Sequence, residues 1–252
     1  MIRVLMVDDD PNILELTQIF LKRSGDILVD TTGSATEGLE KLKDKTDPYE
    51  VVISDYAMPE MDGIAFLKEV RNRKLDLPFI LFTGKSREEV VIEALNCGAD
   101  YYMQKDADPK VLFAELSHQI RQAADRERAR KVDLIQRELA IKLSGVTSLS
   151  QALKLCVEAA IEVSGTDCGT MYLLDRNSGS FILSHSIGFS SDFLEVISQR
   201  RRNPNTSLMA RAKKPIYIRC QDRDLPLQEE REREGLRAMA VIPVQHESWA
   251  SA

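Results

Sequence analysis

Polar side chains that could take part in chemistry stand at the ends of several short apolar runs. Asp8 and Asp9 follow the run at 2–7, and Asp55 ends the run at 51–55. Thr83 closes another run, and Lys105 follows a fourth. Carboxylates bind hard cations through oxygen, while a hydroxyl and an ammonium neutralise the oxygens of a transferring phosphoryl group. These residue types indicate phosphoryl transfer to a carboxylate.

The chain around these residues alternates between apolar runs and amphipathic segments. Runs typical of buried strands lie at 2–7, 27–32, 51–55, 78–83 and 100–104, and a helical pattern follows each one. Five strands alternating with five helices predict an α/β fold with a parallel sheet covered on both faces. In the flavodoxin-like strand order the first and third strands are neighbours at the switch point, so Asp8, Asp9 and Asp55 converge there.

Three carboxylates in one pocket repel one another and need a cation. An all-oxygen site with few protein ligands suits Mg²⁺, which keeps several of its waters. Asp10 has a different interpretation, because an aspartate directly before Pro11 is typical of a helix N-cap. We therefore expect Asp10 to cap a helix and the other three aspartates to form a metal site.

The same segments resemble the receiver domain of two-component response regulators. The matching pieces are VDDDP at 7–11, DYAMPEMDG at 55–63, FTG at 82–84, GADYY at 98–102 and Lys105. The resemblance implies a flavodoxin-like, doubly wound, five-stranded parallel sheet over residues 1–120. The implied partner is a histidine kinase or a phosphotransfer protein.

The resemblance also assigns roles to the matching residues. It implies that Asp55 is the phosphoacceptor. Thr83 and Lys105 would bind the phosphoryl group, and Thr83 and Tyr102 would form the switch that responds to it. Asp9 would bind Mg²⁺ directly and Asp8 through a water. The full set of implied metal ligands is Asp8, Asp9, Asp55 and the backbone carbonyl of Ala57.

Two departures from the family pattern lie beside the site. Receivers usually follow the lysine with a cis-proline, whereas Asp106 follows here, so we expect a different loop shape. The run at 105–120 looks like receivers of methanogenic archaea. The positions that often hold the hydrolytic water are Ala57 and Lys85 in this chain. Because alanine cannot orient water, we expect a long-lived phosphoaspartate.

Histidine chemistry and ester hydrolysis are the competing interpretations. His118 lies in a segment like the phosphoacceptor box of a kinase, but Gln119 replaces the usual acidic residue, and we expect His118 to end the receiver's last helix. His185 and His246 lack partners at metal-ligand spacing. A phosphatase needs a second acid where Ala57 stands. We expect a phosphoacceptor that is not a substrate-turnover enzyme, with a vestigially phosphorylated interaction module as the alternative.

Residues 121–143 predict a helical linker. Helix formers fill the chain from 110 to 143 without glycine or proline, and apolar residues at 132, 135, 139 and 143 form one stripe. Two heptads are too few to assert a coiled coil. Either the helix pairs with its copy in a homodimer and transmits the receiver's state, or it is a solvated spacer.

Residues 144–252 predict an α+β domain. An amphipathic helix with apolar positions from 149 to 161 precedes a hairpin that turns at 177–179, and apolar runs follow at 214–220 and 236–244. We expect these strands to form one mostly antiparallel sheet. The order resembles a GAF domain, a small-molecule sensor and dimerisation fold, although no residue selects a ligand.

The last segment departs from the GAF pattern. After 244 a GAF domain continues through further strands, whereas HESWASA follows here, so we expect a C-terminally truncated GAF-like domain or a fragment of a longer hybrid signalling kinase. The run at 236–244 would then present an unpaired edge. We interpret Arg200, Arg201 and Arg202 as a solvated loop. The cysteines are expected to be reduced and mostly buried: Cys97, Cys156, Cys168 and Cys220.

The composition is that of an ordinary globular chain. It has 252 residues, a formal net charge of −6, 43% hydrophobic residues and 29% charged residues. Without a membrane-length apolar run or a signal peptide we expect a cytoplasmic protein that does not bind membranes. The acidic first half and the lack of a basic stripe argue against direct nucleic-acid binding. The predicted function is to accept a phosphoryl group on Asp55 and relay this state through the linker to a sensor-like domain.

Overall fold

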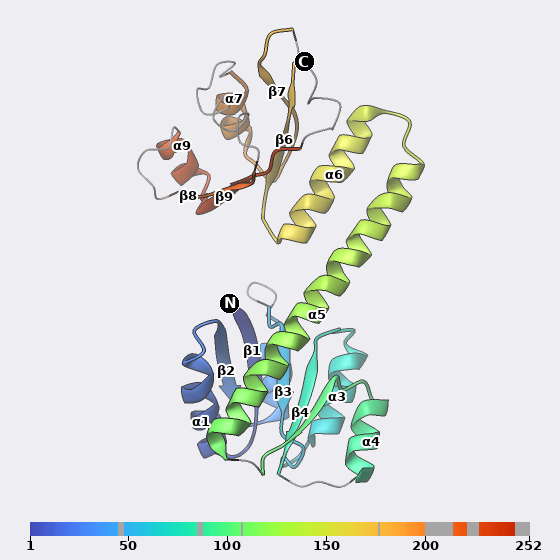
Figure 1. Ribbon diagram of the computed structural model, residues 1–252, viewed down its shortest axis with the longest axis vertical. Coiled ribbons are helices and arrows are strands. Elements are labelled where there is room, and N and C mark those ends of the chain that lie inside the picture. Colours follow the sequence, from blue (N-terminus) through green and yellow to red (C-terminus); the bar gives the residue numbers. More distant parts are fainter. Residues whose placement is uncertain are drawn as a thin grey trace. The chain divides into compact units, whose positions relative to one another are not determined.

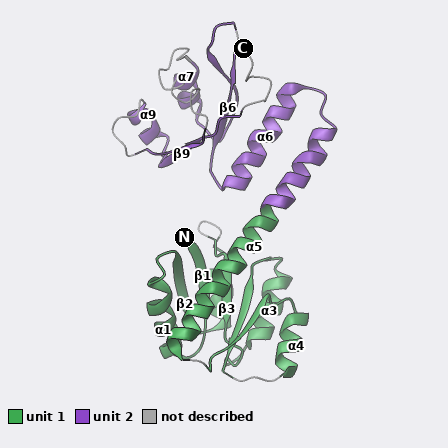
Figure 2. Ribbon diagram, viewed as in Figure 1, with its two compact units in different colours: residues 1–131 green, residues 132–252 purple. Residues whose placement is uncertain are grey.

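The computed structural model describes residues 1–44, 48–84, 88–106, 108–175, 177–199, 214–220 and 227–244. The chain divides into two compact units, Met1–Lys131 and Val132–Ala252 (Figure 2). One helix, α5 (Pro109–Ser144), continues across the division without a break. The predicted domain boundaries, after residues 120 and 143, both fall within this helix.

The first unit alternates strands and helices as the sequence predicts. The strands are β1 (Ile2–Val7), β2 (Ile27–Thr32), β3 (Val51–Ser54), β4 (Phe79–Thr83) and β5 (Tyr101–Gln104). The helices that follow them are α1 (Pro11–Lys22), α2 (Ala35–Lys41), α3 (Gly63–Asn72), α4 (Glu88–Asn96) and α5.

The five strands form one parallel sheet in the order β2-β1-β3-β4-β5 (Figure 1). This order confirms the predicted flavodoxin-like arrangement, because β1 and β3 are neighbours. In the register, Val7 lies opposite both Thr32 and Ser54, and Thr83 lies opposite Gln104. The residues that follow the strands therefore emerge at the same edge of the sheet.

Two apolar clusters cover the two faces of this sheet. Side chains of α2, α3 and α4 pack on one face, where the Phe66 and Phe79 rings meet edge to face with centroids 5.7 Å apart. Side chains of α1 and α5 pack on the other, where Phe20 stacks on Phe113 at 4.9 Å. Each fully buried side chain of this size contributes about 2 kcal/mol of transfer free energy, so both faces stabilise the strand ends.

Polar caps begin the helices that leave the strand ends. The Asp10 carboxylate accepts from the Asn12 backbone N–H, which confirms the predicted cap of α1. Ser34 and Asp62 cap α2 and α3 in the same way through Glu37 and Ala65. Such caps satisfy backbone donors that the helix itself cannot pair.

The loop between β3 and α3 passes very close to the backbone of the predicted phosphoacceptor. Gly63 begins α3, and its N–H donates to the Tyr56 carbonyl at 2.9 Å. A Cβ atom at Gly63 would lie 2.2 Å from the Asp55 carbonyl oxygen and 2.8 Å from Leu81 Cδ1. Only glycine leaves room for this approach.

Helix α5 extends beyond the part of it that packs on the sheet of the first unit. It passes through His118 and ends at Ser144, so the expectation that the receiver's last helix ends near His118 is wrong. The reason is local, because the sequence from Lys110 to Leu143 contains neither glycine nor proline to stop a helix. Among its described residues, the last buried one is Ala124.

The second unit contains helices and two short hairpin-like pairs of strands. Its helices are α6 (Leu149–Ser164), α7 (Ser191–Gln199) and α9 (Gln228–Arg233). Its strands are β6 (Gly169–Leu174), β7 (Phe181–Ile187), β8 (Ile216–Arg219) and β9 (Ala238–Val241). The antiparallel pairing of β6 with β7 confirms the predicted hairpin.

The described strands of this unit form two separate ladders, β6-β7 and β8-β9, instead of the single sheet we expected. No described backbone hydrogen bonds join one ladder to the other. Most residues of β6 and β7 are half-buried, but some apolar side chains stay open to solvent, since Ile182 is 56% exposed and Tyr217 78% exposed. On α6, only Val157 is buried among the described residues of its apolar stripe.

The cysteines are free thiols, but they are less buried than expected. Cys220 is buried, whereas Cys97, Cys156 and Cys168 are half-buried. These three lie just after α4, on the partly exposed α6 and just before β6, where packing covers one side only. The expectation of mostly buried thiols is therefore wrong for them.

Some predicted features lie outside the described residues. These are Lys85, Arg200, Arg201, Arg202, His246 and the segment 245–252. His185, on β7, lies within the described part and contacts the Ser150 and Ser184 hydroxyls. In the ranges described, every helix is too short or too polar to cross a membrane.

Gly63→Ala tests the close approach beside the phosphoacceptor. We expect the substitution to lower the free energy of unfolding by about 1 to 3 kcal/mol, because the new Cβ atom must displace backbone. Urea unfolding followed by circular dichroism measures this effect. Gly33→Ala is the matched control, because a Cβ atom there meets nothing within 4 Å. Equal urea midpoints for the two variants would show that the loop accommodates a Cβ atom at position 63.

Candidate functional site

The backbone ladder of the sheet continues by one residue beyond the strands and fixes the site. The Asp8 N–H donates to the Thr32 carbonyl at 3.1 Å, and the Asp55 N–H donates to the Val7 carbonyl at 2.8 Å. At the other side of the site, the Lys105 N–H donates to the Thr83 carbonyl at 2.9 Å. The side chains of Asp8, Asp55 and Lys105 therefore leave from backbone positions held by the sheet.

The structure brings the three predicted carboxylates together. One oxygen from each of Asp8, Asp9 and Asp55 lies within 4.8 Å of the others. Asp8 and Asp55 are buried at 1% and 5% exposure, whereas Asp9 is exposed. The cluster is thus closed at its base and open to water at Asp9, which suits a small hydrated cation.

Lys105 bridges the two buried carboxylates. Its Nζ atom donates to Asp8 Oδ2 and to Asp55 Oδ1, both at 2.6 Å. The same ammonium lies 5.3 Å from the centre of the Phe82 ring. Only 15% of the Lys105 side chain is exposed, so water screens these pairs weakly. One ammonium therefore offsets part of the repulsion among the three carboxylates.

The electrostatic balance at Asp8 shifts its carboxyl toward the protonated form relative to an aspartate in water. Burial is the largest effect and raises the pKa of this carboxyl above its usual value near 3.8. The hydrogen bond and charge of Lys105 lower the pKa, as does the Asp10 backbone N–H, and the negative charge of Asp55 raises it. A second cation at the site would relieve the remaining cost of the charged form.

Two backbone N–H groups complete the site, and the sequence analysis missed both. The Asp10 N–H donates to Asp8 Oδ1 at 3.0 Å, and the Ala57 N–H donates to Asp55 Oδ2 at 2.7 Å. Each donor stands two residues after the carboxylate, as in an Asx turn. The signal that was available is an aspartate directly after a strand and before a turn. These donors orient the oxygens that Lys105 does not hold.

The other predicted residues border the cluster. Thr83 is buried at the end of β4, and Tyr102 is half-buried on β5. Tyr102 packs against the apolar cluster beneath α2, α3 and α4. The backbone of Ala57 lies beside the Asp55 carboxylate through their hydrogen bond. Asp10 caps α1 and is not among the aspartates of the metal cluster.

The donor set fits a hard divalent cation. All three clustered groups are carboxylates, and the described residues of the cluster include no sulfur or imidazole ligand. Asp8, Asp9 and Asp55, with the carbonyl of Ala57, would hold Mg²⁺, a cation that prefers oxygen ligands and keeps waters. When bound, the ion supplies positive charge for phosphoryl oxygens.

Comparison with known families and curated proteins points to one class for the first unit. The family model described as "Response regulator receiver domain" matches residues 4–117. The response regulator SaeR of Staphylococcus aureus strain USA300 is 35% identical over 118 residues, which is 47% of this chain and 50% of that relative. The chain thus spans about half the length of the curated relatives that it matches.

Solved receiver domains also resemble this part of the chain. A receiver domain protein from Clostridium thermocellum is 28% identical with a TM-score of 0.46, and the match covers 51% of this chain and 98% of that one. TrrA from Thermotoga maritima, solved in complex with Mg²⁺ and BeF, is 32% identical with a TM-score of 0.42, covering 49% and 99%.

Residues 4–117 are therefore a response regulator receiver domain. In two-component signalling, histidine kinases phosphorylate domains of this class. The clustered aspartates are consistent with the Mg²⁺ site that such phosphorylation requires. The GAF-like interpretation of residues 144–252 and the similarity to receivers of methanogens stay predictions.

Asp8→Asn tests the charge balance of the site. Because the folded-state pKa of Asp8 is raised, its ionisation destabilises the fold once the pH exceeds that pKa, and this cost is absent below the unfolded pKa of about 3.9. Without Mg²⁺ at pH 7, we expect the variant to be more stable than the wild type by about 1 kcal/mol, as measured by urea unfolding.

Two further measurements complete this test. The gain in stability should shrink as the pH falls toward 4, because Asp8 then becomes neutral in the wild type too. Mg²⁺ should stabilise the wild type more than Asp8→Asn. The exposed neighbour offers the control Asp9→Asn, for which we expect little change without Mg²⁺. A lower urea midpoint for Asp8→Asn at pH 7 would contradict the charge balance described above.

Proposed function

We propose that this protein is a response regulator that accepts a phosphoryl group on Asp55 from a histidine kinase or a phosphotransfer protein. The observation that supports this proposal is the convergence of Asp8, Asp9 and Asp55 at one sheet edge with Lys105 bonded to two of them. We assign the acceptor role to Asp55 because it stands at the phosphoacceptor position of the receiver pattern, where its carboxylate accepts hydrogen bonds from Lys105 and from the Ala57 N–H.

The geometry supports a direct transfer. An oxygen of the Asp55 carboxylate attacks phosphorus and forms an O–P bond, while the P–N bond to the donor histidine breaks and its electron pair stays on the imidazole nitrogen. Lys105 and the Thr83 hydroxyl bind phosphoryl oxygens as negative charge shifts onto them. The backbone N–H of Ala57 keeps the carboxylate oriented during the attack.

The relay beyond Asp55 is part of the proposal. Thr83 and Tyr102 adjust to the phosphoryl group, and α5 carries the change to a GAF-like second unit in a cytoplasmic homodimer. The continuous helix α5 supports this route, because it joins the receiver to the second unit without a loop. The chain acts as a phosphoacceptor, without a separate site for substrate turnover.

The first experiment measures phosphorylation directly. We expect incubation with Mg²⁺ and acetyl phosphate to add one phosphoryl group per chain, detected as intact mass. Asp55→Asn should take up none, and Asp192→Asn, an exposed aspartate of α7, should behave as the wild type. Chelation of Mg²⁺ should abolish uptake. No adduct in the wild type while Mg²⁺ binds would leave an interaction module with vestigial phosphorylation as the better function.

The lifetime of the phosphoaspartate tests the role of Ala57. This exposed residue stands two positions beyond Asp55 and has no polar side chain to orient water. We expect Ala57→Asn to shorten the half-life several-fold, about 1 kcal/mol in the hydrolysis barrier, measured by mass after removal of acetyl phosphate. Ala65→Asn, on an exposed position of α3, is the control. A wild-type half-life of only seconds would contradict this expectation.

A further inference from the structure

Helix α5 carries arginines around the point where its apolar packing ends. Its buried side chains run from Leu112 to Ala124 among the described residues. Arg121 lies near the end of this stretch, and three more arginines follow it at 126, 128 and 130. Three of these four side chains reach back to carboxylates of the first unit. Charged groups thus continue the attachment of α5 where apolar contacts stop.

Two of these three contacts are forked pairs of hydrogen bonds. Arg121 donates from Nε and Nη2 to the two oxygens of Asp26 at 2.8 and 2.9 Å. Arg128 holds Glu50 in the same fork, at 2.7 and 2.9 Å. The forked geometry fixes the orientation of both groups as well as their distance.

Arg130 makes the third attachment through two carboxylates. It donates to Glu127 on its own helix at 2.7 and 2.9 Å, and to Asp76 at 2.5 Å. The Glu127 side chain is only 12% exposed, so it holds the guanidinium in place for Asp76. The neighbouring carboxylates, Glu127 first, raise the pKa of Arg130, which keeps it charged.

The three carboxylate anchors share one location in the sheet. Asp26 directly precedes β2, Glu50 directly precedes β3, and Asp76 stands shortly before β4. They therefore lie at the amino edge of the parallel strands, whereas Asp55 lies at the carboxyl edge. The arginines attach α5 to the edge of the receiver opposite the phosphoacceptor.

We propose that Arg121, Arg128 and Arg130 clamp residues 121–130 of α5 to the receiver, so that this segment moves with the receiver and is not a flexible linker. Combined with the proposed function, on which this part rests, the clamp passes phosphorylation-dependent changes to residues 132–144 through one stiff helix. Each exposed pair contributes modestly, but three on one rigid helix share the cost of ordering it.

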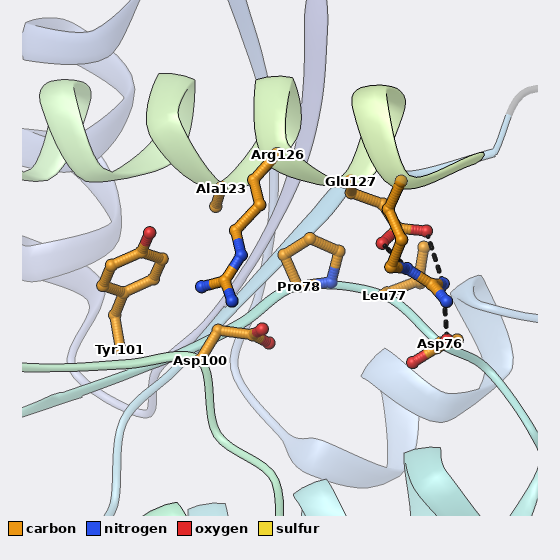
Figure 3. A pocket seen from close by; sticks show the side chains of 9 residues that line it. Asp76, Leu77, Pro78, Asp100, Tyr101, Ala123, Arg126 and Glu127 are labelled. Carbon is orange, nitrogen blue, oxygen red and sulfur yellow. Dashed lines mark hydrogen bonds and ion pairs between the residues drawn. The ribbon is translucent and has the colours of Figure 1, made fainter. Parts of the chain in front are cut away.

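Arg126 provides a matched control on the same helix. In the described part of the chain, no carboxylate oxygen lies within ion-pair distance of its guanidinium. It projects over a pocket of about 220 Å³ beside Pro78, Asp100 and Tyr101 (Figure 3). Arg126→Gln therefore removes the same charge from α5 without breaking a clamp.

Amide hydrogen exchange of the full chain tests the clamp. In the triple variant Arg121→Gln, Arg128→Gln and Arg130→Gln, we expect amides of residues 121–131 to exchange about tenfold faster, since exposed pairs contribute a factor of about 1.5 to 5 each. Arg126→Gln should stay within about twofold of the wild type. High salt should speed exchange of this segment in the wild type and not in the triple variant.

A charge-swapped pair guards against a general loss of folding. Glu50→Arg alone should speed exchange of residues 121–131, and Glu50→Arg with Arg128→Glu should restore slower exchange. Equal rates in the triple variant and Arg126→Gln would overturn the clamp, as would a failure of the swapped pair to recover.

The relay is measured separately. In the wild type, phosphorylation should change exchange in residues 132–144. The triple variant should lose this change, although intact mass shows that Asp55 is still phosphorylated. A preserved change in the triple variant would overturn the clamp as the route. If phosphorylation changes nothing in the wild type, the proposed relay fails, and the exchange of residues 121–131 still decides the clamp.

Discussion

A parallel sheet brings the carboxyl ends of all its strands to one edge, and the site depends on this constraint. Asp8, Asp55 and Lys105 are far apart in the sequence, yet each follows a strand whose neighbour fixes its backbone by a ladder hydrogen bond. The apolar clusters on both faces of the sheet stabilise the positions of these strands. The same packing buries the carboxylates of Asp8 and Asp55, and burial raises the pKa of Asp8. The fold therefore creates the electrostatic repulsion among the carboxylates as well as the geometry in which they can bind a cation.

Much of the first unit could be predicted from local patterns. Strict alternation predicted a parallel sheet covered on both faces, and the resemblance to receivers implied its strand order. Because the aspartates stand where strands end, that order made their meeting predictable. The two N–H donors from Asp10 and Ala57 were not, because backbone groups carry no signature in side-chain type. The long-range ion pairs were equally hidden. Arg121 and Asp26 lie 95 positions apart, and no periodicity links them. The end of the receiver's last helix was misplaced because a histidine near a predicted end is a weak stop signal.

The two units differ in how completely they bury their apolar residues. In the first, every strand is covered by helices on at least one face and the clusters are continuous. In the second, the amphipathic pattern of α6 was predicted correctly as a helix, but its partner sheet is two separate ladders in the described residues. Periodicity identifies which side of an element is apolar, whereas it does not identify what covers that side. This is why the sequence predicted the elements of the second unit better than their assembly.

The bridge from Lys105 to Asp8 and Asp55 affects how a cation would bind at this site. A divalent ion does not enter an empty ring of carboxylates, because two of the three already share an internal counterion at 2.6 Å. Mg²⁺ held by Asp8, Asp9 and Asp55 would therefore share these carboxylates with Lys105. The affinity for the ion would depend on the free-energy difference between the ion-bound cluster and the cluster paired with Lys105. The stronger the pairing with Lys105, the weaker this affinity would be. Without the ion, Lys105 offsets only part of the repulsion among the three carboxylates, and its ammonium stands beside Asp55, where it would meet the oxygens of an incoming phosphoryl group.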